Sequence, residues 1–147
     1  EVAEETKQLL RVTKESLYKA IQQSIVGRRI GDIGYTVQNY CEQHGYGVVR
    51  EFVGHGIGKE MHEDPQVPNY GRRGTGSLLK SGMCLAIEPM ITMGTRQIYL
   101  EDDGWSVRTR DGKCAAHFEH TVAVRHGKAD ILSSFEFIEE VLGDKAI

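Results

Sequence analysis

Apolar residues recur at roughly helical spacing through the first part of the chain and predict two helices. The first is expected over residues 1–26, and Gly27 ends its pattern. The second is expected to begin with Asp32 as its N-cap and to end at Gly45, which follows the last periodic position. The apolar face of the first helix is formed by Val2, Leu9, Leu10, Leu17, Ile21 and Ile25.

Beyond the second helix, shorter apolar runs separated by turn residues predict strands. The Asp-Gly pair before Trp105 indicates that two of these runs form a hairpin. Pro65 and Pro68 are expected to hold residues 64–70 in an extended conformation. The segment from Gly71 to Ser77 lacks periodicity and is expected to be a loop. The expected strands cover residues 46–52, 83–90, 97–100, 105–109 and 115–124. The C-terminal residues 127–147 suggest a turn, a short apolar run and a polar tail.

Composition then limits the class of protein. A length of 147 residues suits one domain, with 39% hydrophobic and 27% charged residues. The net charge of −3 and the lack of a basic stripe argue against a nucleic-acid partner. No apolar run is long enough to span a bilayer, so no membrane partner is expected. Three widely spaced cysteines without a Cys-x-x-Cys pair favour reduced thiols in a cytoplasmic compartment.

The first candidate for chemistry is the glycine-rich stretch from Val53 to Tyr70. His55 stands between Gly54 and Gly56, where neighbouring side chains do not crowd it. His62 follows seven residues later, directly before an acidic pair and a proline. A surface imidazole on a glycine-rich turn would explain this stretch equally well, because short motifs are weak evidence alone.

Two carboxylates are predicted among apolar residues, where an unpaired charge is costly. Glu88 is expected at the end of one strand, where Pro89 stops it, and Glu119 in the middle of another. Alternation along the second strand puts His117 on the same face as Glu119. Together with His55, these carboxylates are a donor set suited to Mn, Fe, Co or Zn, and two carboxylates suit a two-metal site. The acidic turn at residues 102–103 is better explained by solvated turn chemistry than by metal binding.

Four blocks of the chain, in this order, resemble bacterial type I methionine aminopeptidases. They cover Val-Gly-His-Gly-Ile-Gly with Met-His-Glu-Asp-Pro, Gly-Met-Cys-Leu-Ala-Ile-Glu-Pro-Met, Asp-Gly-Trp-Ser-Val-Arg-Thr, and His-Phe-Glu-His-Thr. The resemblance extends from the first helix to about Ser133. It implies the α+β pita-bread fold, with two similar halves around a dinuclear metal site. It also implies removal of the N-terminal methionine of nascent chains by metal-activated water.

The resemblance assigns roles to individual positions. His55, Glu88 and Glu119 are similar to metal ligands, with Glu119 bridging two divalent ions and Glu88 also acting as general acid/base. His62 is similar to a histidine that contacts substrate near the scissile peptide. The methionine side-chain pocket is expected to be lined by Trp105 and Met61. Many family members have an aromatic residue at the position of Met61. The resemblance implies Co, Mn, Fe or Zn as the two metal ions.

The family also supplies two aspartate ligands and a further substrate-contacting histidine, from segments that would precede this chain. We therefore expect residues 1–147 to form the C-terminal half of a single catalytic domain. Alone, this half is expected to bind metal weakly and to have little or no activity. It is also expected to expose apolar surface that an N-terminal half or self-association would cover.

Two alternatives stay open. A pita-bread prolidase or X-Pro aminopeptidase shares the glycine-histidine and Ile-Glu-Pro blocks. It would, however, carry an Arg-x-Glu-Asp pattern before the last ligand, which this chain lacks. The second alternative is a non-catalytic peptide-binding module on the same fold. Retention of His55, Glu88 and Glu119 argues against it, and binding of metal would distinguish the two.

Overall fold

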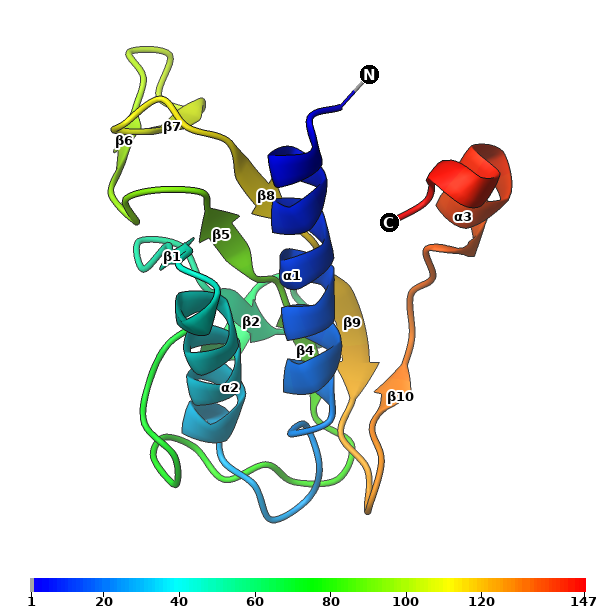
Figure 1. The fold of residues 1–147 in the computed structure, drawn as a ribbon. Coiled ribbons are helices and arrows are strands. Elements are labelled where there is room, and N and C mark those ends of the chain that lie inside the picture. The colour runs from blue at the N-terminus through cyan, green and yellow to red at the C-terminus, as the bar shows by residue number, and fades with distance from the viewer. Residues whose placement is uncertain (1) are drawn as a thin grey trace.

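The computed structural model describes residues 2–147 as two long helices packed against short antiparallel strands, with a small helix near the C-terminus (Figure 1). The helices are α1 (Glu4–Ile21), α2 (Ile30–Gln43) and α3 (Glu136–Leu142), followed by a 3-10 turn, η1 (Gly143–Lys145). The strands are β1 (Gly47–Val48), β2 (Gly54–Gly56), β3 (Glu63–Val67), β4 (Cys84–Ile87), β5 (Met90–Thr92), β6 (Ile98–Leu100), β7 (Val107–Thr109), β8 (Ala115–His117), β9 (His120–Ala123) and β10 (Asp130–Ile131).

Helix α1 ends earlier than its sequence pattern indicates. The predicted helix over residues 1–26 stops at Ile21, and Ile25 instead forms a bridge with Arg125. The N–H of Val26 donates to the carbonyl of Arg125 at 3.0 Å, so this segment pairs with the chain just after β9 rather than with the preceding helical turn. The predicted apolar face of the helix packs into the core, since Leu9, Leu17 and Ile21 are buried.

Helix α2 is confirmed, but its predicted N-cap is wrong. The helix begins at Ile30, and Asp32 lies inside its first turn. From there the Asp32 carboxylate accepts the backbone N–H of Arg29 at 2.8 Å and that of Gly74 at 2.9 Å. Asp32 therefore caps the helix from within, while also anchoring the loop that includes Gly74. At the other end Gly45 has a φ of +78°, the left-handed conformation expected just after a helix.

The strands form three antiparallel sheets. The five-stranded sheet has the order β10-β9-β4-β2-β3, the three-stranded sheet β1-β5-β8, and β6 pairs with β7 as the predicted hairpin. Both long helices cover the same side of the sheets (Figure 1). The predicted strand over residues 46–52 is reduced to Gly47–Val48, because the chain turns away after Val49 donates to the carbonyl of Met90.

Two predicted strands are each divided between two sheets. Residues 83–90 form β4 in the large sheet and the first residue of β5, which belongs to the three-stranded sheet. Residues 115–124 form β8 in the three-stranded sheet and β9 in the large sheet. The break after β4 lies opposite the break before β9, because Ile87 pairs with His120 and Met90 with His117. Glu88 and Glu119 occupy these breaks, so the prediction that Glu119 projects from the middle of a strand was wrong. Pro89 contributes to the interruption because it has no N–H to donate.

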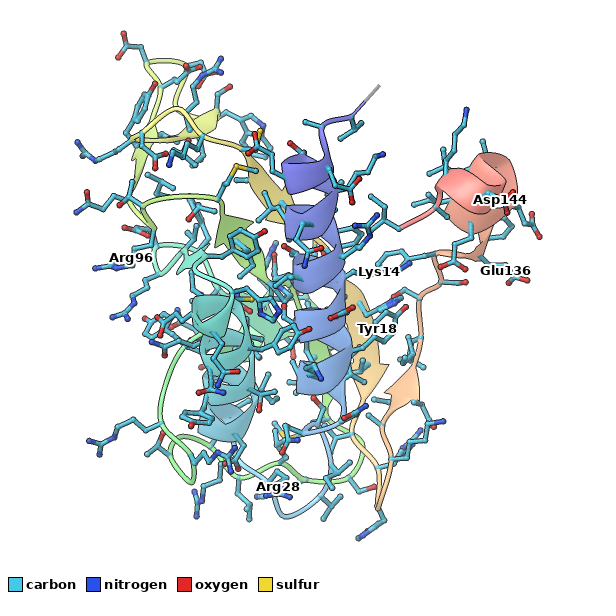
Figure 2. All side chains as sticks on the ribbon, in the orientation of Figure 1. Lys14, Tyr18, Arg28, Arg96, Glu136 and Asp144 are labelled. Carbon is cyan, nitrogen blue, oxygen red and sulfur yellow. The ribbon has the colours of Figure 1, made fainter. Side chains whose placement is uncertain are left out.

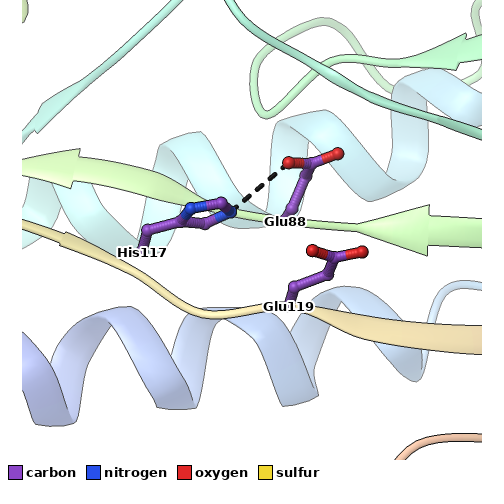
Figure 3. Close-up of side chains that lie close together, drawn as sticks. All are labelled: Glu88, His117 and Glu119. Carbon is purple, nitrogen blue, oxygen red and sulfur yellow. Dashed lines mark ion pairs between the residues drawn. The ribbon is translucent and has the colours of Figure 1, made fainter. Parts of the chain in front are cut away.

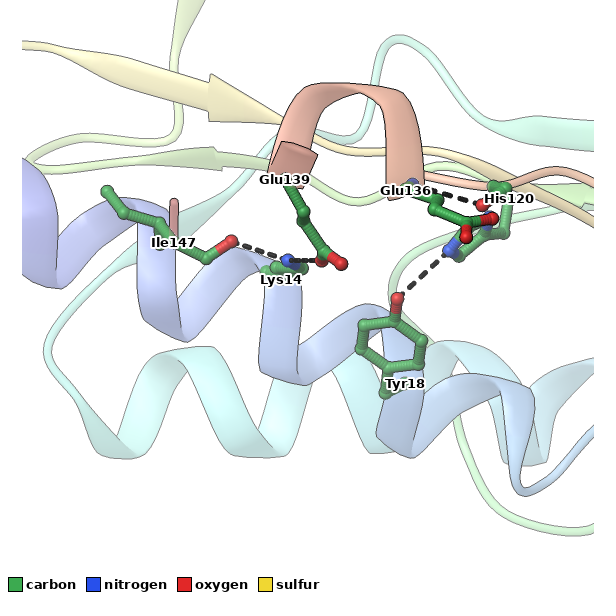
Figure 4. Close-up of polar contacts among 7 residues, drawn as sticks. Lys14, Tyr18, His120, Glu136, Glu139 and Ile147 are labelled. Atoms are coloured by element: carbon green, nitrogen blue, oxygen red, sulfur yellow. Dashed lines mark hydrogen bonds and ion pairs between the residues drawn. The ribbon is translucent and has the colours of Figure 1, made fainter. Parts of the chain in front are cut away.

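The C-terminal segment returns to helix α1, where the sequence predicted only a polar tail. Lys14 of α1 lies on the side of the helix that faces the C-terminal segment (Figure 2). It donates to the Glu139 carboxylate at 3.0 Å and to the carbonyl of Ile147 (Figure 4). The buried ring of His120 lies between the Tyr18 hydroxyl, at 3.1 Å, and the Ser133 hydroxyl, at 2.7 Å. Burial, and then the charge of Lys14, hold the pKa of His120 below its ordinary value. None of the helices in residues 2–147 combines the length and the apolar character required to cross a bilayer.

Candidate metal centre

His55 lies on an interior strand of the five-stranded sheet, next to the edge strand. It lies on β2, which is paired with β3 on one side and with β4 on the other. A Cβ atom at Gly54 would collide with the carbonyl oxygen of Ala86, and one at Gly56 with the carbonyl oxygen of Asp64. The glycines around His55 are therefore required by the close approach of neighbouring strands, not by a positive φ.

The orientation of the His55 ring fixes which nitrogen faces the site. Its Nδ1 lies 3.0 Å from the backbone carbonyl of Gly56, which is only an acceptor, so Nδ1 carries the proton and donates. The other nitrogen, Nε2, lies 3.5 Å from Oε1 of Glu88. In the neutral ring both of these atoms are acceptors, so a proton or a metal ion is needed between them.

Glu88 presents its second oxygen to another histidine. Oε2 of Glu88 lies 3.3 Å from Nε2 of His117, and the Glu88 side chain is only 12% exposed (Figure 3). Glu119 comes from the opposite strand break and points toward Glu88. One ligand atom from each of Glu88, His117 and Glu119 lies within 4.8 Å of the others. His55 is outside this group but contacts it through Glu88.

These donors fit a divalent metal ion. Among residues 2–147, neither Glu88 nor Glu119 has a Lys or Arg partner within 4.0 Å. Two nearby carboxylates repel each other unless a cation or a proton lies between them. Imidazole nitrogen and carboxylate oxygen together are ligands that Zn, Fe, Co and Mn accept. The group is therefore near enough to hold a divalent metal, and the assignment of His55, Glu88 and Glu119 as its ligands stays a prediction.

A cavity of about 860 Å³ opens beside these donors. His55, His62, Glu88 and His117 line one part of it, and the rings of His55 and His62 lie 4.2 Å apart between centroids. Trp105, which precedes β7 and is 87% exposed, lines another part. The cavity thus joins polar groups that hold or move protons to an apolar wall formed largely by the β6–β7 hairpin.

The structure places Met61 differently from Trp105. Met61 is 75% exposed and is not among the residues that line the cavity. Its predicted contact with a methionine side chain stays a prediction. Asp103 behaves as turn chemistry requires, because its carboxylate accepts the backbone N–H groups of Trp105 and Ser106.

No role was predicted for His117, although the structure places it within reach of Glu88 and Glu119. The available signal was its alternation with Glu119, which put both side chains on one face. That signal was not decisive, since a histidine in a strand is common and nothing local indicated that the strand would break after it. Only the pairing of β8 with β5 brings His117 opposite Met90 and so near Glu88.

Comparison with known proteins provides a family for this site. Residues 1–126 match the model of metallopeptidase family M24. A methionine aminopeptidase of Clostridium acetobutylicum is 52% identical over 136 residues, covering 92% of this chain and 54% of that protein. The crystal structure of methionine aminopeptidase from Thermotoga maritima aligns with a TM-score of 0.88 and 48% identity, covering 90% of this chain and 53% of that one.

More distant structures share the fold alone. The X-Pro aminopeptidase of Thermotoga maritima aligns with a TM-score of 0.66 at 23% identity, over 91% of this chain and 32% of that one. The α+β pita-bread architecture expected from the sequence is therefore confirmed. The chain spans about half the length of the curated relatives that it matches.

Proposed function

Because this chain belongs to metallopeptidase family M24, we propose that it carries part of the active site of a methionine aminopeptidase. The substrates would be the N-terminal peptides of nascent proteins, with methionine as the first residue. The observation that carries the proposal is the contact of His55 with Glu88 in the wall of a cavity with an apolar side, with Glu119 close to Glu88. Identity of 52% to a methionine aminopeptidase supports this substrate over proline-containing peptides.

We assign the metal-holding role to His55, Glu88 and Glu119, and the family resemblance favours two ions drawn from Co, Mn, Fe and Zn. When bound, such ions would supply Lewis acidity and lower the pKa of water toward neutrality. The hydrogen bond from Nδ1 of His55 to Gly56 supports this role, since it leaves Nε2 free as a ligand.

The remaining side chains would act on the peptide itself. Glu88, at the cavity wall, would accept a proton and return it to the leaving amine. His62 would donate a hydrogen bond to the substrate near the scissile peptide, where charge develops on the carbonyl oxygen. Trp105 and Met61 would contact the methionine side chain, and the exposed ring of Trp105 provides a flat apolar surface for it.

We further propose that the isolated chain has weak activity and needs a partner surface. The described residues expose a group of large apolar side chains on α3: Phe137, Ile138, Val141 and Leu142. An N-terminal half of the same domain, or a second copy of this chain, would cover apolar surface of this kind. Three free cysteines support a reducing compartment, and we place the protein in the cytoplasm.

A chimera provides the test of the function. This chain would replace the matching segment of the Clostridium acetobutylicum relative, and release of methionine from Met-Gly-Met-Met would be measured with added Mn²⁺ or Co²⁺. The chimera is expected to release methionine, whereas the 147-residue chain alone should give turnover near background. Glu88→Gln is expected to abolish release, and the exposed Glu140→Gln serves as its matched control.

The outcomes separate the alternatives. A folded chimera that releases no methionine would contradict the proposal, and if it also bound no metal the peptide-binding module would be favoured. Preferential cleavage of X-Pro dipeptides would identify a prolidase instead. Robust turnover by the chain alone would overturn the claim that it is incomplete.

A further inference from the structure

Asn69 is a buried polar side chain to which the proposed mechanism gives no role. It follows the end of β3 by two residues, and none of its surface is exposed. Its Nδ2 donates a hydrogen bond to the backbone carbonyl oxygen of Glu88 at 3.0 Å. This contact joins the end of one strand to the residue that we expect to hold metal and to move a proton.

The arrangement of the strands brings the two residues together. Both β3 and β4 pair antiparallel with β2, so they run in the same direction and end at the same edge of the sheet. Asn69 lies just beyond the end of β3, and Glu88 directly follows β4. A Cβ atom at Gly54, the first residue of β2, would lie 2.3 Å from the carbonyl oxygen of Ala86 and 3.2 Å from that of Val67. This close approach lets the Asn69 side chain reach from the end of β3 to the end of β4.

The backbone of Glu88 lies where the ladder between β4 and β9 is interrupted. Ile87 pairs with His120 and Met90 with His117, and among residues 2–147 no strand residue is paired with Glu88. A buried carbonyl needs a donor, and here a side-chain amide supplies the hydrogen bond that the broken ladder does not. Asn69 therefore holds the backbone at the strand break from which the Glu88 carboxylate projects.

The other end of the Asn69 amide shows which atom matters. Its Oδ1 is buried, and no group in residues 2–147 donates to it. Turning the amide over would put Oδ1 against the carbonyl of Glu88, and both atoms are acceptors. The Glu88 carbonyl alone thus sets the orientation of the amide. Because an unsatisfied buried acceptor is costly, the position is explained by the N–H group of Asn69 and not by packing.

Helix α2 makes this link rigid. A Cβ atom at Gly34 would lie 2.6 and 2.3 Å from the carbonyl oxygens of the residues before and after Asn69. The backbone N–H of Gly71 donates to the side chain of Gln38, also on α2, at 3.2 Å. The segment that carries Asn69 therefore rests on the helix, and its side chain transmits that fixed position to Glu88.

We propose that Asn69 is a positioning residue, which fixes the direction of the Glu88 carboxylate in the metal centre by holding its backbone at the strand break. This inference rests on the proposed metallopeptidase function and deepens it. The side chain of Glu88 is only 12% exposed, and its two oxygens face His55 and His117. Asn69 does not line the cavity, so it acts through Glu88 and not on the substrate.

The experiment measures Co²⁺ binding to the 147-residue chain and to its Asn69→Leu variant, in which an apolar side chain of similar size replaces the amide. Calorimetry gives the Kd, and the visible absorption of bound Co²⁺ reports the geometry of its ligands. Asn69→Leu is expected to raise the Kd by about tenfold or more, the scale for loss of a group that orients a ligand, and to shift the absorption. Asn39→Leu, the same change at an exposed position of α2, should alter neither.

A second control separates positioning from loss of stability. Val12→Ala opens a cavity in the core from α1 and should lower the urea unfolding midpoint while keeping the Kd within twofold. Asn69→Leu should instead raise the Kd by more than its change in midpoint explains. Weakening of Co²⁺ binding by both variants in proportion to their lost stability would overturn the positioning role.

NMR of the metal-free wild-type chain tests the contact without any variant. The side-chain amide hydrogens of Asn69 should exchange slowly with water, because they are buried and bonded, and Nδ2 should show a coupling through the hydrogen bond to the carbonyl carbon of Glu88. Rapid exchange of these hydrogens in the folded chain would overturn the inference.

The results that overturn the inference differ from those that overturn the function. If folded Asn69→Leu keeps the wild-type absorption and a Kd within twofold, while Glu88→Gln binds Co²⁺ at least tenfold more weakly, Asn69 has no positioning role but the metal centre stands. If the wild-type chain gives no heat and no absorption with Co²⁺, both proposals fail.

Discussion

Nε2 of His55 lies 3.5 Å from Oε1 of Glu88, with the His55 proton committed to the carbonyl of Gly56 on the other side of the ring. Two acceptors that face each other need a cation between them, which is the physical basis of the metal centre. The relationship depends on β2 and β4 being neighbours in the sheet, since His55 pairs with Ala86.

The close approach of β2 to β4 at Gly54 leads to a prediction for the stability of the fold. Gly54→Ala is expected to destabilise the fold by about 1–3 kcal/mol, because the new methyl group overpacks against the carbonyl of Ala86. Urea unfolding measures the change. The control is Gly127→Asn, at an open turn with a φ of +76° that Asn tolerates. Equal stability of Gly54→Ala and wild type would refute the requirement for glycine there.

Trp105 is the only tryptophan, so its fluorescence reports directly on the cavity. Met-Gly-Met-Met with Mn²⁺ should shift its emission to shorter wavelength, because the peptide covers an 87% exposed ring. Trp105→Ala should raise the peptide Kd by about tenfold, as expected for losing part of one apolar contact surface. The unfolding midpoint of Trp105→Ala should stay near that of the wild type. Val141→Ala, at another exposed position, is the control and should also unfold near the wild-type midpoint. An unshifted emission would remove Trp105 from the substrate contact.

The Asp32 carboxylate is expected to stabilise the folded protein in a pH-dependent way. Burial acts to raise the pKa of Asp32, but the N–H groups of Arg29 and Gly74 and the charges of two arginines outweigh it and hold the pKa below its usual range. Because the folded pKa is the lower one, the stabilisation is present above the unfolded pKa of about 3.9 and is lost as the pH falls through the folded value.

Asp32→Ala should therefore cost about 1–2 kcal/mol in the free energy of unfolding at pH 7, the usual range for loss of a helix cap. The difference from wild type should shrink as the pH is lowered below 4. Urea unfolding across this range measures it, with the exposed Asp144→Ala as control. A difference that stays constant down to pH 2 would show that the Asp32 charge is not involved.

The three cysteines should differ in reactivity. Burial raises the pKa of the Cys41 thiol to about 12, and its side chain is fully buried, whereas Cys114 is exposed. Since the thiolate is the reactive form, Cys114 should be alkylated rapidly at pH 8 and Cys41 only after unfolding. Mass spectrometry after iodoacetamide treatment distinguishes the sites. Modification of native Cys41 at the rate of Cys114 would contradict the packing of α2.

Local pattern identified the two long helices, the hairpin and the two carboxylates that lie close together, but not how the strands divide. An apolar run such as 83–90 has the same period whether it stays in one sheet or passes into another. Only its partners decide this, because β4 pairs with β9 and β5 with β8. The sequence therefore predicted Glu88 at a strand end but placed Glu119 inside a strand.

The same limit explains the other errors. His117 acquires its place from a long-range pairing, which no spacing in the sequence encodes. Helix α3 has only seven residues, too few for the spacing of its apolar side chains to identify a helix. The spacing of Ile25 predicted that it would continue helix α1, but Ile25 instead pairs with Arg125 beyond the end of the helix. For His117 and Ile25, a long-range contact decided the structure where local spacing did not.

The most direct test of the metal centre is anomalous diffraction from crystals of this chain soaked in Mn²⁺. We predict a manganese peak at bonding distance, about 2.0–2.2 Å, from a Glu88 oxygen and an imidazole Nε2, and its loss in Glu88→Gln crystals. Crystals with no peak near Glu88, in which His55 and Glu88 keep their contact through a proton alone, would contradict the account.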